Sequence, residues 1–423
     1  MLTEHQNLKL NQSLHILSQG DRLLVKGSAG TGKTFMINEL IRQLIVHCKG
    51  TIACTAPTNK AVSVLQNKIS VKGKINFMST HAALKMKRFV NEETGDIYFK
   101  PDYTKKFPPL EGISYLIVDE ASMISKEMLD YIEEWATKQK CKTVFLGDEK
   151  QLPPVNEINT PVFSKNYPCV ELLEIIRQKG GNPIINLSFN LDLLKSYQDN
   201  LIKKEPEIDV PIGYVFSKDF NKIIEKLVMS NGTDLYKYIG YTNEEVNKVN
   251  SVVRNRLYGN TPQRVEIGET MVFDAPYKQE YSTNEEITIH EAVVLTNTFS
   301  YTKEDKIPLK YYLINAKGGE GLWIGGVRIL HEDSEEDFKS VKREIKDKIK
   351  KGELTWAEYY DFIEQFAYLK YNHAITCHKS QGSTYQNVII NISDMRKCRG
   401  KEYKNLLYTG ITRASKMVVL YNA

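Results

Sequence analysis

The sequence lacks long hydrophobic runs, and its charges are close to balanced. No stretch approaches the roughly 18 consecutive apolar residues that a membrane-spanning helix needs, and the first residues contain no apolar segment typical of a secretory signal. The formal net charge of +5 is small, so it permits a polyanionic partner without demonstrating one. We therefore expect a soluble cytoplasmic protein that does not associate with membranes.

Cysteine is scarce and has no metal-binding arrangement. The six cysteines form no C-x-x-C pair and have no spacing to histidine typical of a zinc site. Free thiols buried in a protein of a reducing compartment are the simplest interpretation. These residues are Cys48, Cys54, Cys141, Cys169, Cys377 and Cys398.

Signs of disorder and of simple repetition are also missing. Hydrophobic residues make up 41% of the chain and charged residues 26%, which is typical of globular proteins. There is no low-complexity segment and no repeat beyond two α/β halves. Because 423 residues exceed one ordinary hydrophobic core, we expect roughly two to four domains.

The first part of the chain alternates short apolar runs with helical patterns. Residues 35–48 place apolar side chains at helical spacing directly after one such run. Short apolar runs separated by helices predict a parallel sheet that is covered on both faces. The predicted strands are 22–26, 51–55, 115–118 and 143–146.

Two insertions interrupt the α/β pattern. A basic and aromatic stretch, 85–109, carries the turn signal Glu93-Thr94-Gly95-Asp96 and predicts a β-hairpin. Further on, a β-rich segment and a charged helical stretch broken near Gly352 separate the two parts of a second α/β unit. We predict an α/β fold with domains 1–181, 182–260 joined to 372–423, and a small-barrel and helical insert, 261–371.

A phosphate-binding loop follows the first predicted strand. The sequence from Gly27 to Thr34, GSAGTGKT, fits G-x-x-x-x-G-K-[ST] and lies between a strand and an amphipathic helix. Glycines let the N–H groups of Gly27, Ser28, Ala29, Gly30, Thr31 and Gly32 approach phosphates at a helix N-terminus. Lys33 is expected to bind the β- and γ-phosphates of ATP, and the Thr34 hydroxyl to bind Mg²⁺. The alternative is a glycine-rich turn without nucleotide.

Two carboxylates follow a later buried strand. Asp119 and Glu120 come directly after the run YLIV, at the strand end where ligands of open α/β sheets bind. Asp119 is expected to hold Mg²⁺, and Glu120 to orient and deprotonate the attacking water. A solvated pair of loop carboxylates is the alternative.

Further motifs resemble those of superfamily 1 helicases, in the family's order. Within that superfamily the pattern is most similar to the RecD-like branch and its compact Dda-type members, which share the DEASM version of motif II. The matching segments are 56–60 (motif Ia), 79–81, 147–155 (motif III), 174–178 (motif IV), 376–382 (motif V) and 408–414 (motif VI).

The resemblance implies two RecA-like domains with ATP·Mg²⁺ between them. Gln6 stands where the family has its adenine-recognition glutamine, although Asn7 and Lys9 make its surroundings more polar than usual. Gly382, in motif V, is expected beside the nucleotide. Gln151 is expected to link the γ-phosphate to the DNA-binding surface. Arg177 and Arg413 are expected to stabilise charge on the transferring phosphoryl group, rather than being ordinary surface cations.

The resemblance also implies a surface for single-stranded DNA. The family positions that touch the strand mainly contact phosphate and sugar, which gives binding without sequence preference. Turn and cap roles for the hydroxyls, and buried packing for the histidines, are the alternatives. The matching residues are Pro57, Thr58, Thr80, His81, Thr376 and His378.

An aromatic in the predicted hairpin resembles the pin that separates strands in these helicases. Phe99 is either such a pin residue or a packing residue of the hairpin. The basic helix predicted at 337–351 is a solvated face or a second DNA-facing patch. In relatives the small barrel guides DNA and braces the pin.

These features predict an ATP-dependent DNA helicase that acts as a monomer on single-stranded DNA and on single-strand/duplex junctions. The RecD-like resemblance implies 5′→3′ movement, and replication or recombination proteins are candidate partners. A translocase that acts on RNA or displaces proteins, and a P-loop switch without turnover, are the alternatives. Glu120 and the two arginines argue against a pure switch, because nucleotide binding alone requires none of them.

Overall fold

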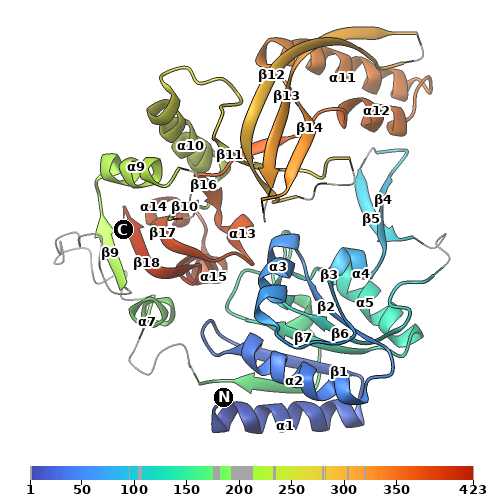
Figure 1. The fold of residues 1–423 in the computed structure, drawn as a ribbon, viewed down its shortest axis with the longest axis vertical. Coiled ribbons are helices and arrows are strands. Elements are labelled where there is room, and N and C mark those ends of the chain that lie inside the picture. The colour runs from blue at the N-terminus through green and yellow to red at the C-terminus, as the bar shows by residue number, and fades with distance from the viewer. Residues whose placement is uncertain are drawn as a thin grey trace.

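The computed structural model describes residues 2–94, 96–102, 107–174, 182–191, 213–231, 235–278, 281, 283–302, 304–318 and 321–422. Three sheets and one small hairpin organise these residues, and Figure 1 shows the sheets as separate layers. Across the described ranges, we find no helix that is both long and apolar enough to cross a membrane.

The first sheet has six parallel strands in the order β3-β2-β6-β7-β1-β8. It confirms all four strands predicted for the first unit, to within two residues at either end. The strands are β1 (Arg22–Gly27), β2 (Thr51–Ala56), β3 (Ile75–Ser79), β6 (Ile113–Val118), β7 (Lys142–Gly147) and β8 (Cys169–Leu172). The helical elements are α1 (Glu4–Gln19), α2 (Lys33–His47), α3 (Asn59–Lys68), α4 (Thr80–Ala83), η1 (Ala121–Met123), α5 (Lys126–Lys138) and α6 (Pro161–Ser164).

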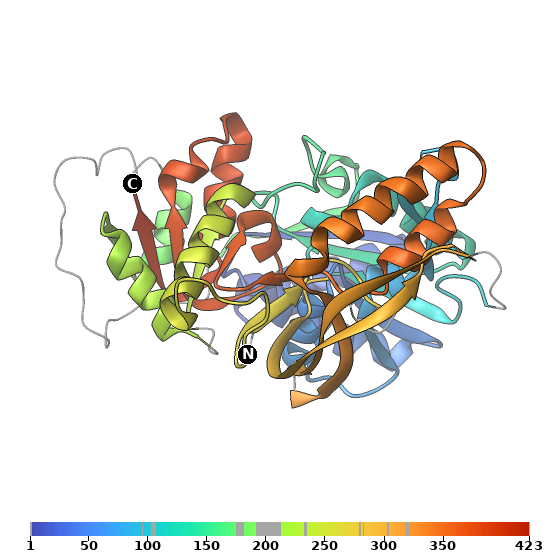
Figure 2. The ribbon, with the colours of Figure 1, turned by 90° about the horizontal axis from the view of Figure 1, so that it is seen from above.

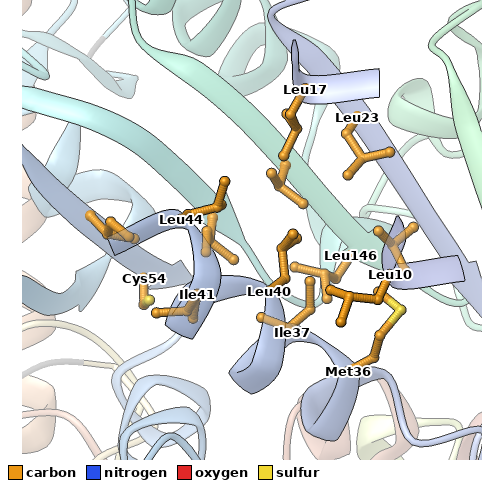
Figure 3. Close-up of a cluster of buried hydrophobic side chains, with 14 of the residues drawn as sticks. Leu10, Leu17, Leu23, Met36, Ile37, Leu40, Ile41, Leu44, Cys54 and Leu146 are labelled. Carbon is orange, nitrogen blue, oxygen red and sulfur yellow. The ribbon is translucent and has the colours of Figure 1, made fainter. Parts of the chain in front are cut away.

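Apolar side chains cover both faces of this sheet, as predicted. On one face α1 and α2 pack together, and the fully buried Leu40 and Ile41 of α2 belong to the same cluster as Leu10 of α1 (Figure 3). On the other face Leu129 and Ile132 of α5 pack against the sheet. The helical spacing of apolar residues therefore decides which side of each helix meets the strands.

A second sheet has five parallel strands in the order β16-β10-β17-β18-β9. Its strands come from both sides of the β-rich insertion, so the chain leaves this sheet and later returns to it. The strands are β9 (Gly213–Ser217), β10 (Tyr236–Gly240), β16 (Ala374–Thr376), β17 (Tyr385–Asn391) and β18 (Ala414–Tyr421). The helices are α7 (Pro183–Phe189), α9 (Phe220–Met229), α10 (Asn243–Tyr258), α13 (Cys377–Ser380), α14 (Ile392–Met395) and α15 (Gly400–Ile411).

The third sheet is antiparallel, in the order β14-β13-β12-β11-β15. Strands β14 and β15 stand at opposite ends of this order, but Ala367 N, just before β15, donates to Arg328 O of β14 at 2.7 Å. The two ends of the sheet therefore approach each other, although no β14–β15 strand pairing closes the sheet among the described residues. The small barrel stays a prediction. The elements are β11 (Thr270–Phe273), β12 (Glu286–Ser300), β13 (Lys306–Gly318), β14 (Trp323–Leu330), η3 (Glu332–Ser334), α11 (Glu335–Lys350), α12 (Trp356–Ile363) and β15 (Leu369–Tyr371). From here on, "the insert" means these elements.

The predicted helical break near Gly352 is confirmed. Helix α11 ends at Lys350, Gly352 adopts a left-handed φ of 76°, and α12 begins at Trp356. Phe338 of α11 stacks on Phe362 of α12 with ring centroids 5.1 Å apart. The two helices therefore pack as an antiparallel pair, and Figure 2 shows them from the side, next to the long strands of the insert.

The predicted hairpin is present as β4 (Met86–Val90) and β5 (Ile97–Pro101), paired antiparallel. It projects from the first unit towards α12 (Figure 1). Arg88 forms an ion pair with Glu364, and its guanidinium lies 4.4 Å from the centroid of the Tyr360 ring. These contacts attach the hairpin of the first unit to α12 of the insert and to the residue that follows it.

The prediction that all six cysteines are buried is wrong for two of them. Cys169 is exposed and Cys48 is half-buried, whereas the other four are buried. Strand β8 is the edge of its sheet and alternates exposed and buried residues, so Cys169 faces outwards. All six thiols are unpaired.

Candidate nucleotide and DNA site

The phosphate loop joins β1 to α2, as predicted. Gly30 and Gly32 adopt left-handed φ values of 83° and 77°, which favour glycine. A Cβ added to Gly27 would lie 2.6 Å from the Thr31 hydroxyl, so only glycine fits there without a shift. The loop thereby presents backbone N–H groups at the N-terminus of α2, an arrangement that suits an anion.

Lys33 is the first residue of α2 and is folded back onto the loop. Its ammonium donates to the carbonyl oxygens of Gly27 at 2.5 Å and Ser28 at 3.2 Å. Both are weaker partners for a cation than a phosphate would be. Thr34 follows on the same turn and is half-buried.

The two carboxylates lie at the end of β6. Glu120 has a left-handed φ of 50°, and its N–H donates to Asp119 Oδ1 at 2.9 Å. Burial, and next the charge of Glu120, raise the pKa of Asp119 to about 6, although Lys33 opposes this rise. The site therefore concentrates negative charge that a cation would offset.

Mg²⁺ is the cation that these donors fit. A threonine hydroxyl and one carboxylate, Thr34 and Asp119, are hard oxygen ligands, and Mg²⁺ binds through one or two carboxylates while phosphates and water complete its octahedron. The described residues contain no cluster of three or more His, Cys, Asp or Glu that would hold a metal alone.

Gln6 lies against the phosphate loop. It is buried in α1, and its amide donates to the Thr31 carbonyl at 3.3 Å while its oxygen accepts from Thr3 N at 3.2 Å. The Thr31 hydroxyl in turn donates to Ser28 O at 2.9 Å. Helix α1 is therefore hydrogen-bonded to the loop through Gln6, the residue for which the resemblance implied adenine recognition.

Motif III is hydrogen-bonded to motifs V and VI of the other α/β unit. Leu152 N donates to the Thr409 hydroxyl at 3.1 Å, and Leu152 O accepts from Gln381 at 3.1 Å. Asn405 donates to Gln151 O at 3.1 Å. The side-chain Oε1 of Gln151 is buried and accepts no hydrogen bond in the described structure. These bonds tie the end of β7 to α13 and α15.

Tyr408 is a site residue that the sequence reasoning missed. Its hydroxyl accepts a hydrogen bond from Ala29 N of the phosphate loop at 2.8 Å and donates to Asp148 Oδ2 at 2.5 Å. One side chain of motif VI thus touches motifs I and III together. Its position directly before Thr409 in motif VI was the available signal.

Two further predicted nucleotide residues contact protein groups in this structure, and the position of a third is not described. Arg413 is buried, and its guanidinium donates to carbonyl oxygens of its own unit, Thr409 O at 3.1 Å and Ser383 O at 3.2 Å. Gly382 lies against α3, because an added Cβ would meet Ala61 Cβ at 3.1 Å. Arg177 lies outside the described residues.

Comparisons with known proteins agree with this arrangement. Residues 4–192 match the family described as AAA domain, and residues 371–421 match the UvrD-like helicase C-terminal domain. The chain is 26% identical to the ATP-dependent DNA helicase dda of Enterobacteria phage T4, over 97% of this chain and 97% of that protein. It is 25% identical to an uncharacterised protein of Acanthamoeba polyphaga mimivirus, over 98% and 99% of the two chains.

A solved structure gives the fold. Pif1 helicase from Bacteroides, in complex with ADP-AlF3 and single-stranded DNA, superposes with a TM-score of 0.53 at 18% identity, over 100% of this chain and 92% of that one. The two parallel sheets are therefore RecA-like units. The chain belongs to the superfamily 1 helicases, related to Dda and Pif1.

In this helicase the predicted DNA-contacting hydroxyls cap helices. Thr58 caps α3 by accepting from Ala61 N at 3.2 Å, and Thr376 caps α13 by accepting from Lys379 N at 3.4 Å. Thr80 is buried and lies 3.5 Å from the Thr55 hydroxyl. Pro57 directly precedes the cap of α3. The start of α3 lies close to the end of α13, because a Cβ added to Gly382 would lie 3.7 Å from the Thr58 hydroxyl.

Burial favours the neutral form of the two histidines among the predicted DNA contacts. Burial lowers the pKa of His81 and that of His378. His81 meets Phe99 of the hairpin edge to face, with ring centroids 5.8 Å apart, and His378 lies 6.4 Å from the Tyr241 ring. His81 therefore connects the DNA motif to the hairpin.

Two lysines beside the helicase motifs were also missed. Lys60 of motif Ia pairs with Glu286 of the insert at 2.6 Å, and Lys379 of motif V pairs with Asp274, just after β11. Both lysines line a cavity of about 430 Å³, together with Lys339 and Lys342 of α11. The helix that was predicted as a solvated face or a DNA-facing patch therefore contributes two lysines to the same cavity as motifs Ia and V, and one of them, Lys339, is paired with Glu335 and Glu336.

Proposed function

We propose that this helicase couples ATP hydrolysis between its RecA-like units to movement along single-stranded DNA, and that it unwinds duplex DNA. The observation that carries this proposal is the direct hydrogen bonding of motif III to motifs V and VI. Through these bonds, a change at the phosphate loop reaches the helix N-termini on which we place the DNA. The dda relative is named an ATP-dependent DNA helicase, and the Bacteroides Pif1 structure contains single-stranded DNA.

At the nucleotide, Lys33 exchanges its two carbonyl partners for the β- and γ-phosphates. Thr34 and Asp119 would hold Mg²⁺, which neutralises phosphate charge when it is bound. Glu120 orients the attacking water and accepts its proton. Gln151 has a buried oxygen with no partner in the described structure, which leaves it available to sense the γ-phosphate and the attacking water.

Two arginines complete the chemistry in this proposal. Arg413 leaves the carbonyls of Thr409 and Ser383 when the RecA-like units close on nucleotide, and then stabilises charge on the transferring group. Arg177 shares this role. Gln6 contributes to recognition of adenine, and Gly382 permits motif V to approach α3 closely.

On the DNA side, the neutral hydroxyls and N–H groups at α3, α4 and α13 contact phosphate and sugar, and nearby lysines supply charge. Such contacts give binding without sequence preference. ATP-driven closing and reopening of the units changes their grip on the strand, which produces stepping. We assign these units to 1–181 and to 182–260 with 372–423, and the insert to 261–371.

Unwinding of partial duplexes tests the proposal and its direction together. Substrates carrying either a 5′ or a 3′ single-stranded tail are incubated with the protein and ATP, and strand release is followed. We expect release from the 5′-tailed substrate and stimulation of ATP turnover of about tenfold or more by mixed-sequence single-stranded DNA, with binding that weakens as salt rises. Turnover without stimulation by DNA or RNA would favour a nucleotide switch instead.

A further inference from the structure

The Tyr408 hydroxyl bridges two elements that nucleotide must rearrange. Tyr408 belongs to α15 of the second RecA-like unit, and only 2% of it is exposed. Its partners Ala29 N at 2.8 Å and Asp148 Oδ2 at 2.5 Å belong to the first unit, as does the Ser28 side chain, which also hydrogen-bonds to it. The contact with Ala29 spans 379 residues of sequence, so it exists only while the two units are apposed in this way.

The chemistry of this bridge defines a competition. Ala29 has one N–H, and it lies in the loop whose N–H groups receive phosphate oxygens in the proposed function. A hydrogen bond to an anionic oxygen is roughly twice as strong as one to a neutral hydroxyl. A phosphate placed in the loop therefore draws the Ala29 N–H away from Tyr408.

Asp148 fixes the hydroxyl in the orientation that this competition requires. The Tyr408 proton points to Asp148 Oδ2, so an oxygen lone pair faces Ala29. Asp148 is 1% exposed, and its other oxygen accepts from Lys150 N at 3.1 Å. Movement of the tyrosine would leave this buried carboxylate without one of its donors, which motif III must then replace by shifting.

We propose that Tyr408 is a nucleotide-responsive positioning residue, whose hydroxyl accepts the Ala29 N–H in the arrangement that the structure shows and is displaced when phosphate binds in the loop. When the Tyr408 hydroxyl is displaced, Asp148 loses this hydrogen-bond donor, so motif III responds to the binding of phosphate in the loop. This inference rests on the proposed ATP site. It adds a route from the phosphate loop to motif VI that does not involve the arginines.

A purely structural role for Tyr408 makes a different prediction. The ring lies 6.0 Å from the Phe189 ring, and this packing is kept in Tyr408→Phe. Only the hydroxyl bridge is lost. A matched control is Tyr238→Phe, which removes another buried hydroxyl that donates to a carboxylate, Glu245 at 2.7 Å, within the second unit and away from the loop.

The test measures binding of a slowly hydrolysed ATP analogue to the DNA-free full-length protein, followed by steady-state turnover with saturating DNA. Since one net hydrogen bond competes with the nucleotide, Tyr408→Phe should bind the analogue about three- to tenfold more tightly. KM for ATP should fall by a similar factor, while kcat stays within about twofold of wild type. Tyr238→Phe should show neither change.

Hydrogen–deuterium exchange gives a second readout. Amides of the loop 27–34 should exchange faster in nucleotide-free Tyr408→Phe than in wild type. In the wild-type protein, binding of the analogue should increase exchange around Tyr408. Unchanged analogue affinity in a Tyr408→Phe protein of normal melting temperature would overturn the inference, as would unchanged exchange around Tyr408 in wild type. Failure of the wild-type protein to bind ATP would instead remove the proposed function.

Discussion

Lys60 and Glu286 join motif Ia of the first RecA-like unit to the insert through a 2.6 Å ion pair. The Lys60 ammonium also lies 5.3 Å from the centroid of the Tyr385 ring, and Lys237 lies 5.4 Å from the same ring. Burial acts to raise the pKa of Glu286, but Lys60 and Lys237 together hold it below its ordinary value. Glu286 is therefore an anion at the junction of all three parts of the protein.

Glu286 stands where a DNA phosphate would compete for the same lysine. We expect Glu286→Gln to bind single-stranded DNA about two- to fivefold more tightly at low salt, because a partly buried pair of this kind contributes little more than ~1 kcal/mol. Fluorescence anisotropy across a salt series measures this. Glu291→Gln removes the same charge from an exposed position of β12. Equal gains in both variants would show that only the overall charge matters.

Lys33 is the cation of the phosphate loop. In Lys33→Ala the carbonyls of Gly27 and Ser28 lose this donor, and the phosphates lose their mobile positive charge. We expect ATP turnover to fall by about 100-fold or more, while binding of single-stranded DNA without nucleotide persists. Near-normal turnover in a folded Lys33→Ala protein would contradict the assignment of the nucleotide site.

Much of the fold follows from local sequence, since apolar runs and helical spacing identify elements through short-range chemistry. For this reason the strand that leads into the phosphate loop and the strand before Asp119 were predicted to within two residues. The position of the loop between a strand and a helix was predicted from its sequence motif. The resemblance then placed the remaining motifs in order.

Contacts between distant segments could not be predicted in this way. The Tyr408 bridge and the Lys60–Glu286 pair span 379 and 226 residues, and no periodicity records which units face each other. The error at Cys169 has the same origin, because free cysteine is usually buried and only the strand order shows that its strand is an edge. Arg413 was recognised from its motif, but its carbonyl partners depend on the packing of α15 against the segment before β17.

His373 should make stability depend on pH. It is buried, and its Nε2 has no hydrogen-bond partner in the described structure. Burial, and then the charges of Lys237 and Arg254, lower its pKa to about 4. Glu269 lies 4.0 Å away but is neutralised by Arg254 at 2.6 Å. The imidazole is therefore neutral in the folded protein at pH 7.

Since the unfolded chain takes up this proton near pH 6.5, the stabilisation is complete above that pH and is lost as pH falls towards 4. Between pH 7.5 and 5 the loss should be about 2 kcal/mol. Melting temperatures at the two pH values measure it. The melting temperature of His373→Gln should decrease less than that of wild type between the two pH values. His15→Gln, at an exposed position, should show the same decrease as wild type. Equal decreases in all three proteins would contradict the prediction.

A change at Phe99 should distinguish translocation from strand separation. It lies in β5, is 38% exposed, and touches His81 edge to face. The hairpin completes neither RecA-like sheet, and it is braced against α12 through Arg88. We therefore expect its aromatic ring to stack on the base pair at the junction, which contributes ~1–3 kcal/mol per stacked base.

Phe99→Ala should slow duplex unwinding by roughly 5- to 100-fold and leave DNA-stimulated turnover and single-strand translocation nearly unchanged, because the nucleotide residues lie elsewhere. Tyr98→Ala is the matched control: its ring stacks on Phe89 at 5.8 Å, and as the neighbour of Phe99 in the strand it points to the other face of the hairpin. Stopped-flow unwinding, turnover and melting temperature are measured for both variants. If unwinding by Phe99→Ala is normal, or if turnover and melting temperature fall with it, Phe99 packs the hairpin against His81 and does not act as a pin, and the helicase assignment stands without it.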